Sequence, residues 1–180
     1  MPDDFNAMVA GHFAAADAAT SRNEKGRALE DLISYVFGCV PGITRKMRNV
    51  LNEFESEEVD IALWNRMYQD GFYFMPQIIL VECKNWSQPV GSAEVSWFLS
   101  KLERRGLTMG ILIAANGITG NTGDISAAHE IIRHALSTIK IIVITRSELQ
   151  AINSTTDLID LIENKLCELA VAGRLFFQSR

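Results

Sequence analysis

The feature that most constrains the fold of this chain is an apolar run that ends in two charged residues. Residues 78–84 read Ile-Ile-Leu-Val-Glu-Cys-Lys, and a short run of branched apolar side chains is typical of a buried strand. Because strand side chains alternate between two faces, Glu82 and Lys84 share one face and Cys83 lies on the core-facing side. Two charges on one face of a buried strand are costly unless they pair, bind a metal or line a cleft. The pattern therefore predicts a functional site at the end of this strand.

A second strand, predicted over residues 58–65, carries Asp60. Between the two strands lies Asp70-Gly71, a dipeptide that is typical of tight turns. Asp60 and Glu82 are each eleven positions from Gly71. A hairpin that closes symmetrically at Gly71 would make the two carboxylates near cross-strand neighbours.

The rest of the chain predicts alternating helices and strands from its hydrophobic periodicity and its glycine and proline positions. The predicted helices are 3–19, 23–37, 91–105, 124–136 and 156–172, and the predicted strands are 43–51, 58–65, 77–84, 107–115 and 140–145. Three consecutive strands indicate an antiparallel meander, whereas the later strand–helix–strand order indicates right-handed crossovers and parallel strands. We therefore expect an α/β fold, with a mixed central sheet flanked by helices on both faces.

The length of 180 residues predicts a single domain. Its core is expected at about 22–150, with an N-terminal helix at about 3–19 and a C-terminal helix at about 156–172. The net charge of −5 argues against tight nonspecific binding of nucleic acid by a lone monomer. It does not argue against a nucleic-acid enzyme, because a carboxylate-rich metal site itself contributes negative charge.

Composition also bears on the compartment. No apolar run approaches the roughly 20 residues that a membrane-spanning helix needs, so we expect no membrane contact. The N-terminus is acidic at Asp3 and Asp4, unlike the basic start of a signal peptide. Three widely spaced cysteines show no zinc-site spacing and fit a reducing environment. These features favour a cytoplasmic protein.

The chemistry that fits this pattern is metal-assisted hydrolysis of a phosphodiester. Mg²⁺ prefers hard oxygen ligands and keeps several waters, so Asp60, Glu82 and the backbone carbonyl of Cys83 are sufficient candidates. Lys84 is placed to orient the attacking water or to stabilise the transition state. Glu30 flanks the apolar stripe of its helix and is a further candidate for the same cleft. The alternative for the strand residues is a salt bridge at the end of a surface strand.

These residues and their order resemble the PD-(D/E)xK nuclease superfamily, which has the restriction-endonuclease-like fold. The matching positions are Glu30, Asp60 and Glu82-Cys83-Lys84, in the order helix, three-stranded meander, helix, strand. Residues 117–128 and the helix and strand after them look like the Mrr-like restriction branch, so the resemblance covers about 26–149. The sequence departs from the pattern at Val59, where the family name has proline, and at Glu82, where the Mrr branch often has glutamine.

The resemblance implies an Mg²⁺-dependent deoxyribonuclease in restriction or anti-phage defence, with Mn²⁺ able to substitute. DNA is the implied partner. A homodimer and a separate recognition or activating subunit are further expectations, since a duplex has two strands and the chain has no obvious module for reading sequence. Two alternatives stay open: a catalytically silent module that binds DNA or protein, and a nuclease for RNA or branched DNA.

Contacts to DNA are expected from residues around the cleft, of which the basic ones would bind phosphates. The candidates are Arg45, Lys46, Arg48, Trp86 and Gln88. A solvated surface for the basic residues, and core packing for the tryptophan, are the alternatives.

Overall fold

The computed structural model describes residues 5–51, 58–119 and 127–173, and all structural statements below refer to these residues. The helices are α1 (Phe5–Ala18), α2 (Arg22–Gly38), α3 (Ser92–Arg104), α4 (Ala127–Ala135), α5 (Arg146–Gln150) and α6 (Thr155–Ala172). The strands are β1 (Ile43–Leu51), β2 (Glu58–Asn65), β3 (Ile78–Lys84), β4 (Met109–Ala114) and β5 (Lys140–Ile144).

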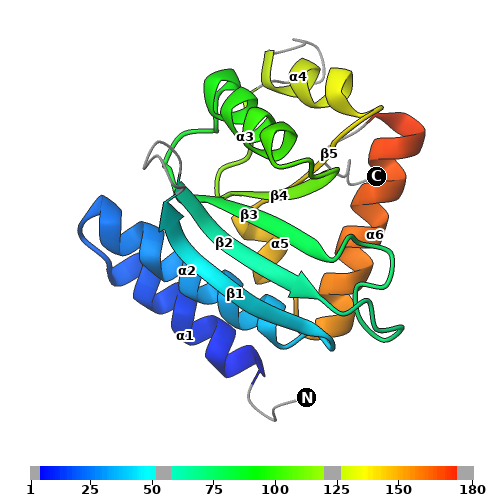
Figure 1. Ribbon diagram of the computed structural model, residues 1–180. Coiled ribbons are helices and arrows are strands. Elements are labelled where there is room, and N and C mark those ends of the chain that lie inside the picture. Colours follow the sequence, from blue (N-terminus) through cyan, green and yellow to red (C-terminus); the bar gives the residue numbers. More distant parts are fainter. Residues whose placement is uncertain (1–4, 52–57, 120–126, 174–180) are drawn as a thin grey trace.

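The strands form one sheet in the order β1-β2-β3-β4-β5 (Figure 1). The β1–β2 and β2–β3 pairs are antiparallel, whereas the β3–β4 and β4–β5 pairs are parallel. The predicted mixed sheet is therefore confirmed, including the change from meander to crossovers after β3. This change places β3 at the centre of the sheet, where its end is flanked by an antiparallel and a parallel neighbour.

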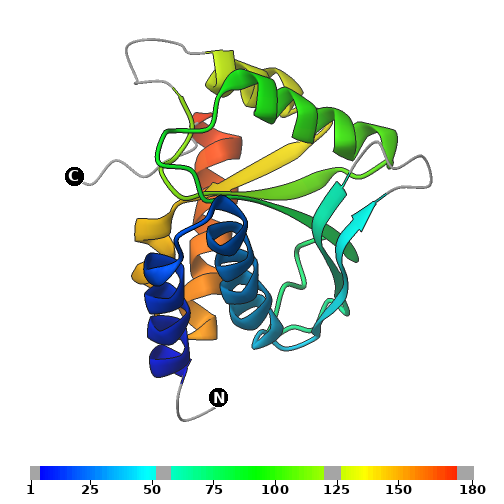
Figure 2. The ribbon, with the colours of Figure 1, turned by 90° about the vertical axis from the view of Figure 1, so that its left-hand side faces the viewer.

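Helices cover both faces of the sheet, as predicted (Figure 2). One buried cluster packs α1, α2, α5 and α6 against the sheet, and the other packs α3 and α4 against its opposite face. The alternation of β3 divides its side chains between these clusters: Ile79 and Val81 join the first, and Leu80 joins the second. Glu82 and Lys84 continue the alternation of Leu80, so they belong to the face that α3 covers.

The close packing of α3 against β4 depends on Gly110. A Cβ atom at this position would lie 2.7 Å from the ring of Phe98 and 2.8 Å from the side chain of Leu102, both on α3. Only glycine therefore lets the helix approach the strand this closely. The approach brings Lys101, which lies on the same buried face of α3, to Glu82 near the end of β3.

The structure adds one helix to the predicted elements, and one predicted helix lies partly outside the described residues. Helix α5 was not predicted, although Thr145 and Glu148 form a capping box at its start, which is a sequence signal for a helix N-terminus. A helix of five residues is too short to show the apolar periodicity from which the other helices were predicted. The predicted helix 124–136 is described from Ala127 to Ala135, as α4, and its first residues, 124–126, lie outside the described residues. None of the described helices is both long and apolar enough to cross a membrane.

Candidate active site

The register of the β2–β3 hairpin brings the predicted carboxylates together. Ile61 pairs with Val81, and the pairing runs without a shift back toward the turn. One further step in this register places Asp60 opposite Glu82. Asp60 Oδ2 accepts a hydrogen bond of 2.7 Å from the backbone N–H of Cys83. The register agrees with the symmetrical hairpin that the sequence predicts.

The long β2–β3 connection is held by a buried asparagine. Asn65 is fully buried, and its Nδ2 donates to the backbone oxygens of Phe72 at 2.7 Å and Met75 at 3.2 Å. Its Oδ1 accepts from the N–H of Met67 at 2.9 Å. Because Phe72 is itself buried, the connection cannot slide without exposing it. This local network fixes the register on which the neighbouring carboxylates depend.

Glu82 is buried and contacts two lysines. Its Oε1 lies 2.8 Å from Lys84 Nζ, and its Oε2 lies 2.5 Å from Lys101 Nζ. The Glu82 side chain is 7% exposed and that of Lys101 is 3% exposed, whereas that of Lys84 is 23% exposed. Lys84 is therefore the member of this trio that solvent reaches most readily. A ligand that approaches from solvent would meet Lys84 before Lys101.

Lys101 is the site residue that the sequence analysis missed. It lies on α3, and its Nζ also donates a 2.6 Å hydrogen bond to the backbone oxygen of Glu58. The signal for it was present, because Lys101 stands three positions after Phe98 and directly before Leu102 in the buried stripe of the helix. A lysine at a core position of an amphipathic helix needs a buried acceptor. The carboxylate of Glu82 and the backbone oxygen of Glu58 are two such acceptors.

Burial and charged neighbours shift the pKa values of Asp60 and Lys84. Burial, together with the charge of Glu82, raises the pKa of Asp60 to about 6. The hydrogen bond from the Cys83 N–H and the charges of Lys84 and Lys101 act in the opposite direction. For Lys84, burial alone would lower the pKa, but the charge of Glu82, its hydrogen bond and the charge of Asp60 raise it overall. Lys84 therefore stays protonated at neutral pH, and Asp60 sits where a further positive charge would stabilise its ionised form.

Glu30 lies on the α2 side of the site and is paired. Arg48 of β1 donates from Nε to Glu30 Oε2 at 2.9 Å and also contacts Asp31. Burial raises the pKa of the Cys83 thiol well above its usual value, with the charges of Asp60 and then Glu30 contributing. Glu30 is thus close enough to act on the end of β3. Arg48, a predicted DNA contact, is engaged with α2, whereas Arg45 and Lys46 are exposed on β1.

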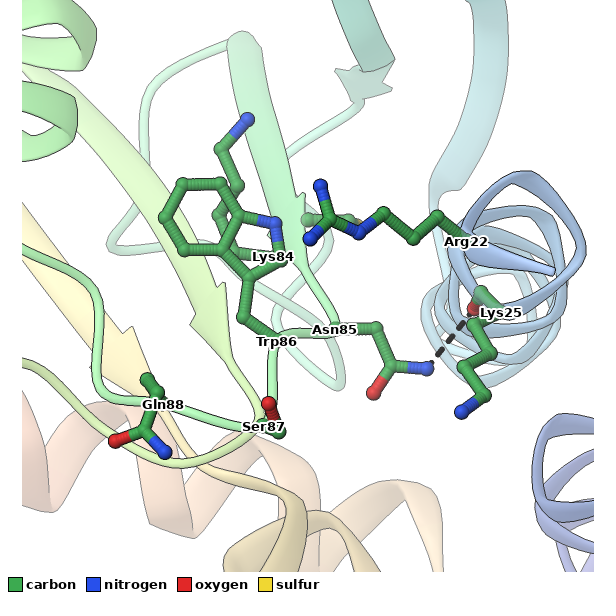
Figure 3. A pocket seen from close by; sticks show the side chains of 9 residues that line it. Arg22, Lys25, Lys84, Asn85, Trp86, Ser87 and Gln88 are labelled. Carbon is green, nitrogen blue, oxygen red and sulfur yellow. Dashed lines mark hydrogen bonds between the residues drawn. The ribbon is translucent and has the colours of Figure 1, made fainter.

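A pocket of about 550 Å³ adjoins the site, between the start of α2 and the end of β3 (Figure 3). Lys84 and Cys83 contribute to its wall, and so do Trp86 and Gln88, two of the predicted DNA contacts. Arg22 and Lys25 reach it from α2. Lys84 therefore both contacts Glu82 and lines the pocket.

The donors present fit a hard divalent cation with few protein ligands. Asp60 and Glu82 offer carboxylate oxygens, and the charge of Glu82 disfavours the ionised form of Asp60, which a bound cation would relieve. Among the described residues, no three side chains of His, Cys, Asp or Glu are grouped as a metal site. The coordination would therefore be completed by a backbone carbonyl and by water, as Mg²⁺ accepts.

Comparison with known proteins identifies a family for this chain. The family model Mrr_cat, described as restriction endonuclease, matches residues 22–152. This range runs from the start of α2 to just beyond α5 and includes the whole sheet. A search of the curated proteins found no match. The chain therefore belongs to the restriction endonuclease family of this model, the Mrr-like branch of the PD-(D/E)xK nucleases with their restriction-endonuclease-like fold.

Proposed function

We propose that the protein is a metal-dependent endonuclease that hydrolyses DNA phosphodiester bonds in restriction or anti-phage defence. The observation that supports this most directly is the contact between Glu82 and Lys84, beside Asp60, at the end of a central strand. The family match supports a nuclease of the restriction-endonuclease type, for which DNA is the substrate. The defence role rests on analogy within the family.

In this proposal Asp60, Glu82 and the carbonyl of Cys83 hold Mg²⁺ or Mn²⁺. When bound, the ion polarises the phosphate and lowers the pKa of a coordinated water. Lys84 is protonated and partly exposed. It therefore stabilises negative charge that develops on the phosphate in the transition state and orients the attacking water.

The remaining residues hold these groups in place. Lys101 fixes one oxygen of Glu82 from the side of α3, which leaves the other oxygen toward Lys84 and the cleft. The N–H of Cys83 fixes Asp60 in the same way. Glu30 on α2, held by Arg48, adds negative charge near Cys83 at the end of β3. A cation would therefore enter a site whose carboxylates are already oriented.

A cleavage panel tests the proposal. Plasmid, linear duplex, methylated duplex, single-stranded DNA, branched DNA and RNA are incubated with the protein in Mg²⁺, Mn²⁺ or EDTA. We expect metal-dependent cutting of DNA, with loss of cutting in the Asp60→Asn variant, which keeps a side-chain oxygen for the Cys83 N–H. Cutting of RNA or branched DNA alone would change the substrate class. No cutting of any substrate would favour a silent nuclease scaffold.

A further inference from the structure

The pocket beside the site is lined by positively charged side chains. Arg22 and Lys25, from the first turn of α2, line it together with Lys84. Neither Arg22 nor Lys25 forms an ion pair with any other residue that the structure describes. No carboxylate belongs to the described lining, although the whole chain has a net charge of −5. The pocket is therefore suited to an anionic group.

A flat aromatic ring stands at the other side of the same pocket. Trp86 is 42% exposed, and Lys84 Nζ lies 5.7 Å from the centre of its ring (Figure 3). The backbone around it is tied down, because Asn116 donates to the oxygen of Trp86 and Asn85 Nδ2 donates to the oxygen of Lys25 at 2.9 Å. These bonds therefore fix the backbone that carries Trp86 against the first turn of α2.

The α2 wall of the pocket lacks a side chain at Gly26. This glycine lies inside a helix, where it is unfavourable relative to alanine. A Cβ atom built on it would meet no heavy atom within 4 Å, so the packing of the protein does not require glycine. A side chain at this position would instead project into the pocket, because Gly26 is part of its lining.

These three features together match the chemistry of a single nucleotide. The volume of about 550 Å³ lies within the range of small-ligand sites, about 300–1,000 Å³. Cations bind phosphate, and an exposed indole stacks on a base regardless of its identity. A base inside a duplex is covered on both faces by its neighbours, so only an unpaired or extruded base offers a face to Trp86.

We propose that this pocket binds an unpaired nucleotide of the DNA next to the scissile phosphodiester, with its base stacked on Trp86 and its phosphate bound by Arg22 and Lys25. The proposal rests on the proposed function, because it takes a nucleic acid as the ligand. It deepens that function by naming the substrate class. DNA with an unpaired nucleotide at the cleavage point is bound and cut in preference to a fully paired duplex.

Binding measured without cleavage tests this proposal. Fluorescence anisotropy in EDTA compares a labelled duplex that contains one unpaired nucleotide with a fully paired duplex of the same flanking sequence. Base stacking on an aromatic side chain predicts tighter binding of the first by about five- to 150-fold. Trp86→Ala should bring this ratio close to one, and Arg22→Ala with Lys25→Ala should lower it.

Trp97→Ala provides the matched control. Trp97 is also an exposed tryptophan next to a cation, with Arg104 at 5.4 Å from its ring, but it lies on α3 outside the pocket lining. The Trp97→Ala variant should keep the full preference. Loss of the preference in this variant to the same extent as in Trp86→Ala would overturn the proposal, because the effect would then be general.

Two further outcomes would also overturn the proposal. One is equal affinity of the wild type for the two DNAs, including no measurable binding of either. The other is Trp86-dependent binding of a free deoxynucleoside monophosphate without any preference between the DNAs. Failure of the nuclease proposal is distinguishable: a Trp86-dependent preference in EDTA, with no cutting in any metal, would support the pocket and reject the catalysis.

Discussion

Lys101 on α3 and Glu82 on β3 form a buried ion pair of 2.5 Å that joins a covering helix to the sheet at the candidate active site. The same ammonium group bonds the backbone of β2 through the oxygen of Glu58. One side chain therefore links the helix, the strand that carries Asp60 and the strand that carries Glu82. The arrangement of the site and the stability of the fold are coupled through this lysine.

Removal of this lysine should destabilise the fold. Lys101→Met keeps the apolar stem but removes the ammonium group. Glu82 then pairs only with Lys84, and the backbone oxygen of Glu58 loses the hydrogen bond from Lys101. We expect the free energy of unfolding to fall by about 1–3 kcal/mol, the cost of a buried polar group that loses a partner. Urea denaturation at pH 7 measures it. In the Glu82→Gln background the same change should cost less, and equal costs in both backgrounds would show that the two residues do not interact.

Asp60 should make the fold less stable as pH rises. Its pKa is about 6 in the folded chain against 3.8 ordinarily. Between these values the folded state binds more protons than the unfolded state, so stability falls as pH rises from about 4 to 6. At about 1.4 kcal/mol per pKa unit, the ionised carboxylate costs roughly 3 kcal/mol above pH 6. Asp60→Asn should therefore be more stable than wild type at pH 8 and similar at pH 4, by urea denaturation at both. Greater stability of the wild type at pH 8 would contradict this.

A bound divalent cation should reverse this cost. Mg²⁺ favours the ionised form of Asp60, and a ligand at 100 times its dissociation constant stabilises a protein by about 2.7 kcal/mol. We expect Mg²⁺ to raise the melting temperature at pH 8 and to have a smaller effect below pH 6, where Asp60 is protonated. The measurement is thermal unfolding with and without Mg²⁺. Asp60→Asn and Glu82→Gln should lose the effect, and the same rise in either variant would place the metal elsewhere.

Gly26 should show opposite effects on stability and on binding. Gly26→Leu replaces an interior helical glycine and should stabilise the fold by roughly 0.5–1 kcal/mol, while its side chain fills part of the pocket. The preference for DNA with an unpaired nucleotide should fall at the same time. Gly11→Leu on α1 is the control, because a Cβ there also meets nothing within 4 Å and the residue is not part of the pocket lining. Gly11→Leu should stabilise the fold by a similar amount and leave the preference for DNA with an unpaired nucleotide unchanged.

The sequence predicts most of the fold because its signals are local. The apolar run of residues 78–84 and the symmetrical placement of Asp60 and Glu82 about Gly71 indicate the strands and their register. Residue spacing does not reveal the contact between Lys101 and Glu82, because it depends on how closely α3 approaches β4 at Gly110.

The pocket is equally hard to predict from the sequence. Its two walls, around Lys25 and Asn85, lie 60 positions apart and meet only through packing and one hydrogen bond between these residues. The pairing of Arg48 with Glu30 also joins two separate elements, and a count of basic residues assigns that arginine to DNA instead. Local patterns thus predict which residues lie on a strand or a helix, whereas contacts between layers need the structure.

The active-site assignment is tested by comparing two lysines that each follow an acidic residue by two positions. Lys84 lies beside Glu82 at the site, whereas Lys165, two positions after Glu163, is buried on α6 and pairs with Glu148. The measurement is the single-turnover rate of DNA cleavage in Mg²⁺ for Lys84→Met and Lys165→Met, each checked for folding by circular dichroism. We predict that Lys84→Met loses about 100-fold or more, as removal of a group that stabilises transition-state charge does, and that Lys165→Met cuts at the wild-type rate. Equal rates for Lys84→Met and the wild type would contradict the assignment of the active site.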